Sequence, residues 1–272
     1  MGEPSSVDVA VIQVALPDGD PEHNRRSLAG VVSSLGPVDL VVAPELFFTG
    51  YDLDMIDAEG TRLAEPLDGP SAALTVELAV RHDTTIVVGF LERAEGGVLY
   101  DSALVATPDG GLRAYRKSHL YPPEQARFAA GDELFVVSTP AGVLAPQICF
   151  EHAFPAIATA QALAGAQVIV IPSAVGSGFE HLLRLRSRAR AQDNQVFVVA
   201  ANLNTPGFCG SSLVADPRGA VLADADGKDA ILRVRLDLAT IDDERAREPS
   251  LTSARPELYH ITAAHGLDHS RT

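Results

Sequence analysis

The sequence predicts an α/β fold, and three observations support this prediction. Apolar runs that are typical of strands alternate along the chain with segments of helical pattern. Some runs, such as residues 167–172, are continuously apolar, as strands of a parallel sheet covered on both faces are. No linker, low-complexity tract or short-period repeat interrupts the alternation. We therefore expect a single domain over residues 1–272, with a core at about 7–240 and a tail at about 241–272.

In the first half of the chain, β-branched apolar runs predict strands and turn residues mark their ends. Strands are expected at 7–16, 39–43, 84–90 and 112–117, extended chain at 91–107, and helices at 21–35 and 71–82. Glu45 directly follows one of these strands and Lys117 ends another. Strand ends often carry function in α/β folds, so Glu45 is a candidate for a site, although Glu45 and Lys117, each taken alone, would more often be solvated surface residues.

The second half repeats the alternation around a cysteine. Strands are expected at 143–148, 167–172, 196–202, 212–215, 220–223 and 231–238, and helices at 155–165 and 179–194. Cys149 ends the first of these runs, and Pro155 favours a helix start soon afterwards. Such an elbow would place Cys149 near the positive end of a helix dipole, so we expect its thiol pKa to fall from roughly 8.5 toward neutrality. Taken alone, however, a cysteine after a core strand is more often a small buried hydrophobe.

Composition excludes several classes of protein. A hydrophobic content of 46% predicts a well-packed globular core. The 21 basic and 36 acidic residues give a formal net charge of −15, which disfavours nucleic acid and anionic membranes as partners. Only two cysteines are present, so a disulfide framework is excluded. No targeting segment and no apolar run of the roughly 18 residues needed to span a bilayer is visible, so we expect a soluble, cytoplasmic protein.

Three short motifs together resemble those of the nitrilase superfamily, the carbon–nitrogen hydrolases, in its amidase-like branch. The motifs are Pro44-Glu45-Leu46 with Gly50-Tyr51, the run Tyr115-Arg116-Lys117-Ser118-His119-Leu120, and Ile148-Cys149-Phe150-Glu151 with Phe154-Pro155. Glu124 lies in a stretch that resembles the loop carrying the second glutamate of the family. The resemblance covers nearly the whole chain and implies a four-layer αββα sandwich that assembles into homodimers or larger homo-oligomers.

The resemblance also implies an enzyme that hydrolyses a small amide, with release of ammonia or an amine, through a cysteine thioester. Cys149 would attack the carbonyl carbon, Glu45 would transfer protons, and Lys117 with the backbone N–H after Cys149 would stabilise the oxyanion. Glu124 would hold Lys117 in place. This chemistry requires neither a cofactor nor a metal.

Substrate contacts are expected close to the three motifs. They are assigned to Tyr51, Phe150, Glu151, His152 and Ser173. No arginine lies among residues 151–154, which favours a neutral or cationic amide over an N-carbamoyl amino acid or a dicarboxylate monoamide. The arginines at 184, 186, 188 and 190 distribute around their helix and are expected to form ion pairs or to cover apolar surface.

Four alternatives remain open at this point. A nitrilase that converts a nitrile to acid and ammonia would use the same triad, and the Phe-Glu-His run at 150–152 also resembles that branch. An N-carbamoyl amidohydrolase and an acyltransferase or amide synthase would share the thioester. A non-catalytic interaction protein would not need to keep all three reactive residues.

Overall fold

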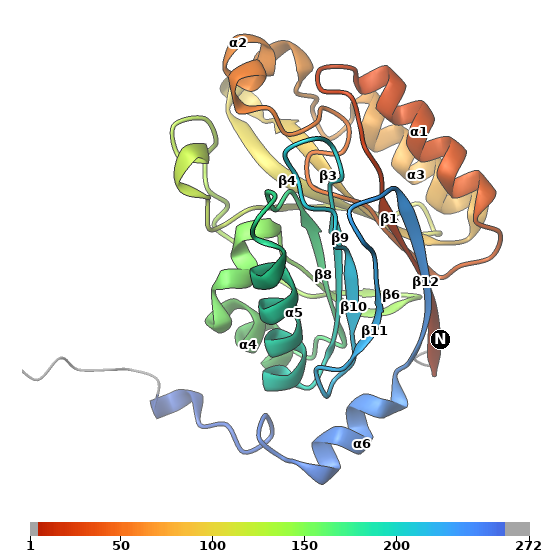
Figure 1. The fold of residues 1–272 in the computed structure, drawn as a ribbon, viewed down its shortest axis with the longest axis vertical. Helices are drawn as coiled ribbons and strands as arrows, with labels where there is room; N and C mark the ends of the chain where they lie inside the picture. The colour runs from red at the N-terminus through yellow and green to blue at the C-terminus, as the bar shows by residue number, and fades with distance from the viewer. Residues whose placement is uncertain (1–4, 259–272) are drawn as a thin grey trace, which may run out of the picture.

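Two six-stranded sheets packed face to face form the centre of the molecule, with helices on their outer faces (Figure 1). The computed structural model describes residues 5–258. The strand order is β12-β1-β2-β3-β4-β5 in the first sheet and β11-β10-β9-β8-β7-β6 in the second. The predicted α/β class and the four-layer sandwich implied by the resemblance are both confirmed.

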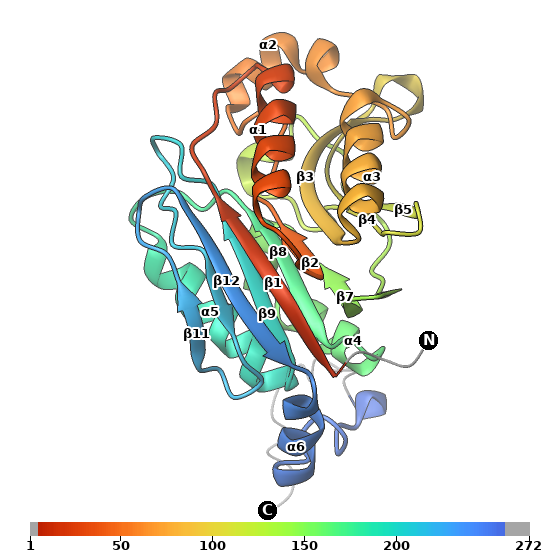
Figure 2. The same cartoon turned by 90° about the vertical axis from the view of Figure 1, so that its right-hand side faces the viewer.

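The first sheet and its helices come mainly from the N-terminal half of the chain. Its strands are β1 (Ser6–Gln13), β2 (Leu40–Val42), β3 (Thr85–Arg93), β4 (Leu99–Ala106), β5 (Leu112–Arg116) and β12 (Ala230–Asp237). The helices of this half are α1 (Pro21–Ser34), α2 (Leu53–Leu63) and α3 (Pro70–His82). Helices α1 and α3 cover the outer face of the sheet (Figure 2).

The second sheet follows in sequence. Its strands are β6 (Val137–Thr139), β7 (Gly142–Pro146), β8 (Val168–Ser173), β9 (Phe197–Asn202), β10 (Leu213–Ala215) and β11 (Val221–Asp224). Its helices are α4 (Pro155–Leu163) and α5 (Glu180–Asn194), and α6 (Ala239–Arg247) follows β12. Strand β12 returns to pair antiparallel with β1, with Ser6 opposite Asp237, so strands near both ends of the described chain share one sheet.

Alternation along the central strands explains the layers. In β1, Val9 and Val11 belong to the apolar cluster between the two sheets, whereas Ala10 and Ile12 belong to the cluster beneath α1 and α3. Successive side chains of a strand point to opposite faces, so a continuously apolar strand supplies two core layers at once. Strand β8 does the same for the second sheet, with Val168 and Val170 facing inward and Ile169 and Ile171 facing the helices.

The elements that sequence patterns missed are short or strongly polar. Helix α2 begins after Asp52, whose carboxylate accepts hydrogen bonds from the N–H groups of Asp54 and Met55. Helix α6 is mostly charged and lies within the stretch predicted to be a tail. The remainder of that stretch, from residue 259, lies outside the described residues. Within residues 5–258, no helix combines the length and the apolar character that a membrane span requires.

Candidate active site

The carboxyl ends of β2, β5 and β7 meet at one end of the sandwich. Glu45 follows β2, Lys117 follows β5, and Cys149 comes three residues after β7 ends. Strand β4 runs antiparallel to β5, so Asp101, near the start of β4, reaches the same place. The topology therefore gathers three sequence-predicted residues and one acid that the sequence did not single out.

The turn that carries Glu45 is packed tightly against β3. Gly89 donates a backbone hydrogen bond to Pro44 (2.9 Å) and accepts one from Phe47 (3.1 Å). A Cβ atom at Gly89 would lie 2.3 Å from the nitrogen of Leu46, so only glycine fits there. Leu46 has a positive φ of 45°. This turn holds the Glu45 side chain in the interior, where it has no exposed surface.

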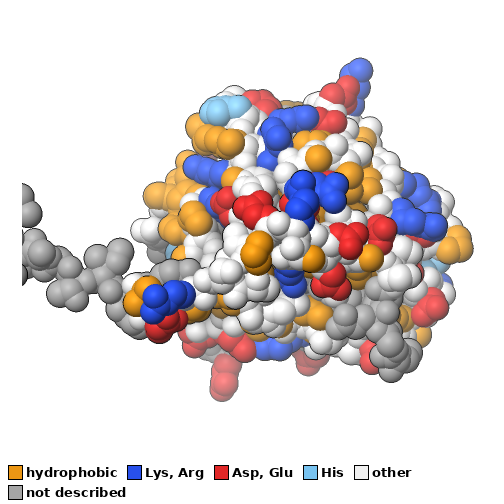
Figure 3. Space-filling view, turned by 90° about the horizontal axis from the view of Figure 1, so that it is seen from below, with side chains coloured by type: hydrophobic (Ala, Val, Ile, Leu, Met, Phe, Trp, Pro, Cys, Tyr) orange, Lys and Arg blue, Asp and Glu red, His pale blue; other side chains and the backbone are white. Residues whose placement is uncertain are grey.

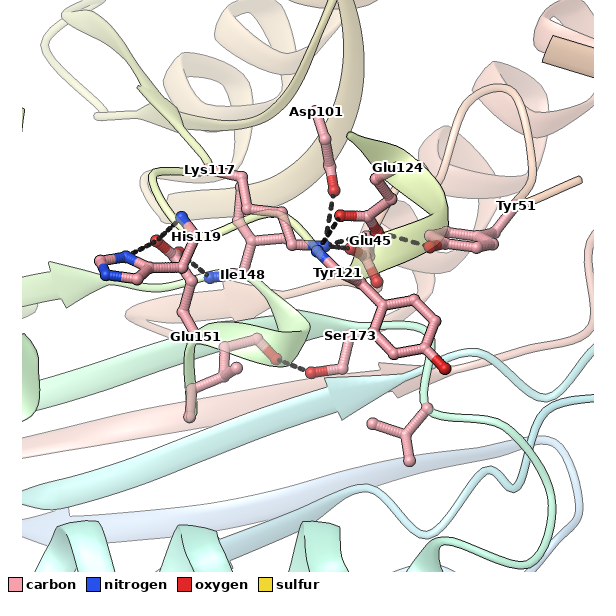
Figure 4. Close-up of polar contacts among 12 residues, drawn as sticks. Glu45, Tyr51, Asp101, Lys117, His119, Tyr121, Glu124, Ile148, Glu151 and Ser173 are labelled. Atoms are coloured by element: carbon pink, nitrogen blue, oxygen red, sulfur yellow. Dashed lines mark hydrogen bonds and ion pairs between the residues drawn. The ribbon is translucent and has the colours of Figure 1, made fainter. Parts of the chain in front are cut away.

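The Lys117 ammonium lies among three buried carboxylates (Figure 4). Its Nζ is 2.6 Å from Glu45 Oε1, 2.8 Å from Glu124 Oε1 and 3.0 Å from Asp101 Oδ2. Carboxylate oxygens of the three acids lie within 4.8 Å of one another, which is also a spacing that suits a metal ion. Here the chain itself supplies the positive charge, because the ammonium is bonded to all three acids.

Burial and mutual repulsion shift the protonation of this cluster. Burial raises the pKa of Glu45 well above its ordinary value, Asp101 and Glu124 raise it further, and Lys117 opposes them. Burial also raises the pKa of Glu124, again against Lys117. Burial alone would lower the pKa of Lys117, but the surrounding carboxylates outweigh it and the pKa rises. The lysine is therefore a permanent cation, while Glu45 accepts a proton more readily than an exposed glutamate does.

Glu124 is fixed by partners on both oxygens. Its Oε2 accepts the backbone N–H of Tyr121 (2.8 Å), and its Oε1 accepts the hydroxyl of Tyr51 (2.5 Å) as well as Lys117. Glu45 differs from Glu124, because its Oε2 has no hydrogen-bond partner among the described residues. Glu45 therefore keeps one oxygen that is not bonded to Lys117.

Cys149 opens a 3₁₀ turn, Cys149–Ala153, with a positive φ of 43°. Helix α4 begins only at Pro155, so the thiol does not lie at the end of its dipole. Burial raises the pKa of Cys149, the Glu45 carboxylate raises it further, and Lys117 opposes the rise. The expectation of a pKa lowered toward neutrality was wrong, because desolvation and a nearby acid dominate at this position. The resting group is the neutral thiol.

Glu151 joins the turn after Cys149 to the segment after Lys117. Its Oε1 accepts Tyr115 Oη (2.7 Å), Ser118 N (2.9 Å) and Ser118 Oγ (2.5 Å), and its Oε2 accepts Ile148 N (2.7 Å). Glu151 is fully buried. The predicted substrate contact by Glu151 does not agree with this placement, because its oxygens are occupied by the two reactive segments.

A pocket of about 370 Å³ opens beside Cys149. It is lined by Tyr51, Tyr121, Cys149, Phe150, His152, Ala174, Val175, Gly176, Phe179, Leu182, Arg186 and Phe208. Of the predicted substrate residues, Tyr51, Phe150 and His152 line it. Ser173 does not: it is buried, and its hydroxyl donates to Ile171 O (3.2 Å). The prediction for Ser173 therefore disagrees with the structure, since its side chain is directed back into its own strand.

Sequence reasoning missed Arg186 as a pocket residue. It comes from α5, and its guanidinium contacts Nε2 of His152 at 3.1 Å. Spacing along a helix cannot show which of several arginines faces a pocket formed by distant segments. Arg186 is identified as a pocket residue by the packing of α5 beside the turn that begins at Cys149, which only the structure shows.

A cysteine at a pocket, backed by a buried lysine and acids at the strand ends of an αββα sandwich, defines a cysteine-type hydrolase. The chain belongs to the carbon-nitrogen hydrolase family, whose model matches residues 8–246. It is an enzyme of the amidase-like branch of the nitrilase superfamily, as the motifs predicted.

Individual relatives agree with this assignment. An (R)-stereoselective amidase from a Pseudomonas species is 32% identical, over 85% of each chain. A CN-hydrolase superfamily protein from Xanthomonas campestris, with an arsenic adduct in its active site, superposes with a TM-score of 0.84 and 25% identity, over 96% of this chain and 99% of the other. An amidase from a Nesterenkonia species gives 0.81 and 25%, over 93% and 98%.

Proposed function

We propose that this chain hydrolyses the carbon–nitrogen bond of a small amide through a thioester on Cys149. The observation that carries the proposal is the position of Cys149, which lines the pocket while Lys117, Glu45 and Glu124 lie buried together. A thiol open to a ligand beside a proton acceptor and a cation is what acyl transfer from an amide requires.

The first step is attack on the amide carbonyl. Because the resting sulfur is a thiol, Glu45 accepts its proton as the sulfur bonds to the carbonyl carbon. The carbonyl π electrons move to oxygen, and the Lys117 ammonium with the Phe150 backbone N–H stabilises the oxyanion. The unpartnered Oε2 of Glu45 suits this role, because Oε1 is already bonded to Lys117.

The second step expels nitrogen and the third restores the enzyme. Glu45 donates its proton to the leaving nitrogen as the C–N bond breaks, which releases ammonia or an amine and leaves a thioester. Glu45 then takes a proton from water, whose oxygen attacks the thioester carbon. The intermediate then collapses: the C–S bond breaks, Glu45 returns its proton to the sulfur, and the acid leaves. Glu124 holds Lys117 throughout, and no step calls for a cofactor or metal.

The test is a screen of small amides, N-carbamoyl compounds and nitriles for ammonia release. We expect amides to be the preferred class, because a Lys–oxyanion interaction suits a carbonyl oxygen. The Cys149→Ala variant should lose at least about 1,000-fold in rate. Cys209→Ala is the matched control, since Cys209 is buried and contacts Asn202 Nδ2 at 3.2 Å. Nitriles turned over faster than matched amides would instead favour a nitrilase.

We also propose that the protein acts in the cytoplasm as a homodimer or larger homo-oligomer, without nucleic-acid or membrane partners. The net charge of −15 supports the last point, as does the mixture of acidic and basic side chains on the face in Figure 3. Exposed Leu185 on α5 (62% of its surface) and Leu163 on α4 (43%) support self-association through the outer helices of the second sheet.

A further inference from the structure

Arg186 differs from the other arginines of α5 in what it contacts. Arg184 forms an ion pair with Asp224, and Arg190 lies 3.4 Å from Asp193. The Nε of Arg188 donates to the carbonyl of Gly219 (2.7 Å). Arg184 and Arg190 thus form the expected ion pairs, and Arg188 is hydrogen-bonded to the backbone. Arg186 lines the pocket and, in the described part of the chain, makes no ion pair with an acidic side chain.

The side chain to which Arg186 is hydrogen-bonded, His152, leaves the charge of Arg186 uncompensated. His152 is 2% exposed, and burial, Arg186 and Arg190 hold its pKa at about 3. The imidazole is therefore neutral at neutral pH, and its Nε2 accepts an N–H of the guanidinium. This hydrogen bond orients Arg186 without neutralising it. A guanidinium carries five N–H donors, so donors remain for a ligand.

The rest of the pocket is mainly apolar. Aromatic rings from separate segments line it, among them Tyr121, Phe150, Phe179 and Phe208. Arg186 is only partly exposed, and a cation beside such walls gains from an anion that supplies both charge and hydrogen-bond acceptors. A carboxylate meets the guanidinium with two parallel hydrogen bonds.

We propose that Arg186, oriented by His152, is a carboxylate-binding residue, and that the substrate is an amide combining an apolar body with a carboxylate. This inference rests on the proposed amide hydrolysis and names its substrate class. It reverses the preference for a neutral or cationic amide, which depended on the lack of arginine directly after Cys149. The positive charge is instead supplied by Arg186 on α5, about 35 residues further along the chain.

The kinetic test compares monoamides of straight-chain dicarboxylic acids, four to eight carbons long, with alkyl amides of equal length. We expect wild type to prefer the carboxylate member, and Arg186→Gln to lower kcat/KM for it by about 10- to 100-fold with little change for the alkyl amide. Arg184→Gln is the matched control, since Arg184 lies on the same helix outside the pocket, and it should leave the ratio unchanged. An equal loss on both series, or an unchanged ratio in Arg186→Gln, would overturn the proposal and leave Arg186 a structural partner of His152.

A binding measurement separates this inference from the proposed function. The dissociation constants of the same compounds are measured by calorimetry on Cys149→Ala and on Cys149→Ala/Arg186→Gln. Weaker binding of the carboxylate series to the double variant, by about 10- to 100-fold, supports the subsite even if neither series is turned over. Equal affinity of both proteins for both series overturns it, even if amide hydrolysis by Cys149 is established.

Discussion

Burial is the main cause of the raised pKa of Glu45, and Asp101, an acid that no motif contains, raises it further. Asp101 adds a third carboxylate to the buried group that is paired with the Lys117 ammonium. If all three acids were ionised, the buried cluster would carry excess negative charge, which is costly without water. An added proton therefore goes readily to Glu45, whose pKa is raised well above its ordinary value, so its carboxylate is a stronger base than an exposed glutamate. The proposed mechanism needs such a base, because the sulfur of Cys149 rests as a neutral thiol and must lose its proton.

The pH dependence of kcat/KM tests this account of Glu45. Its carboxylate is the active form, so activity should fall as the pH drops through its raised pKa, and the acidic limb should lie above pH 4.5, the ordinary glutamate value. Asp101→Asn removes one repelling charge and keeps an oxygen acceptor for Lys117. We expect the acidic limb to move to lower pH, as measured by rates across the pH range.

The control for that experiment is Asp109→Asn, in an exposed turn where Asp109 accepts a hydrogen bond from Thr107. Its acidic limb should coincide with that of wild type. An acidic limb that does not move in Asp101→Asn, or that moves upward, would show that Asp101 does not raise the pKa of Glu45.

Among the elements, the turns after the strands decide the geometry of the site. Glu151 joins the segments after Lys117 and before Cys149, and Gly89 admits the turn of Glu45 against β3. The strand ends that carry Glu45, Lys117 and Cys149 were predictable, because an apolar run stops before Glu45 and before Cys149, and the strand that follows the turn at 108–111 ends at Lys117. The contacts of Glu151, Ser173 and Arg186 were not predictable, since they depend on which segments, distant in the sequence, surround each side chain.

Gly89→Ala should damage the site through the backbone alone. The added Cβ would lie 2.3 Å from the nitrogen of Leu46 and 2.4 Å from the oxygen of Pro44, so the turn of Glu45 must shift. We expect a loss of about 1–3 kcal/mol in the free energy of unfolding, as overpacking costs. A displacement of about 1 Å would lower kcat by about 100-fold. Urea unfolding and kcat on the same preparation measure both effects.

Gly30→Ala provides the comparison. Gly30 lies in α1 with no atom within 4 Å of an added Cβ, so the change should stabilise the helix by about 0.5–1 kcal/mol and leave kcat unchanged. Normal stability and rate in Gly89→Ala would mean that the turn of Glu45 tolerates displacement.

At the scale of the whole molecule, the sandwich explains why the site lies where it does. Glu45, Asp101 and Lys117 come from the first sheet and Cys149 from the second, so the proposed catalytic set forms only when the sheets pack together. The four layers were implied by the resemblance to the family, and the continuous apolar run at 167–172 predicted a strand covered on both faces, as β8 is. The pocket was not predictable, because its walls come from loops and helices far apart in sequence.

The proposed self-association also concerns the whole molecule and can be tested by its mass in solution. Light scattering after gel filtration should give a mass of at least two 28.6 kDa chains. Leu185→Glu places a charge on the exposed apolar surface of α5 and should shift the protein toward monomer. Val80→Glu is the control, because Val80 is 50% exposed on α3, in the opposite outer layer. A wild-type protein that elutes as a single chain would refute the proposed assembly.

The central claim is a covalent thioester on Cys149, and hydroxylamine tests it most directly during turnover of a small amide. We predict that wild type forms hydroxamate at the expense of free acid, and that the acyl group is found by mass spectrometry on the peptide containing Cys149. Cys149→Ala should form neither hydroxamate nor acid, while Cys209→Ala should form both as wild type does. Undiminished amide hydrolysis by a folded Cys149→Ala variant would contradict the account.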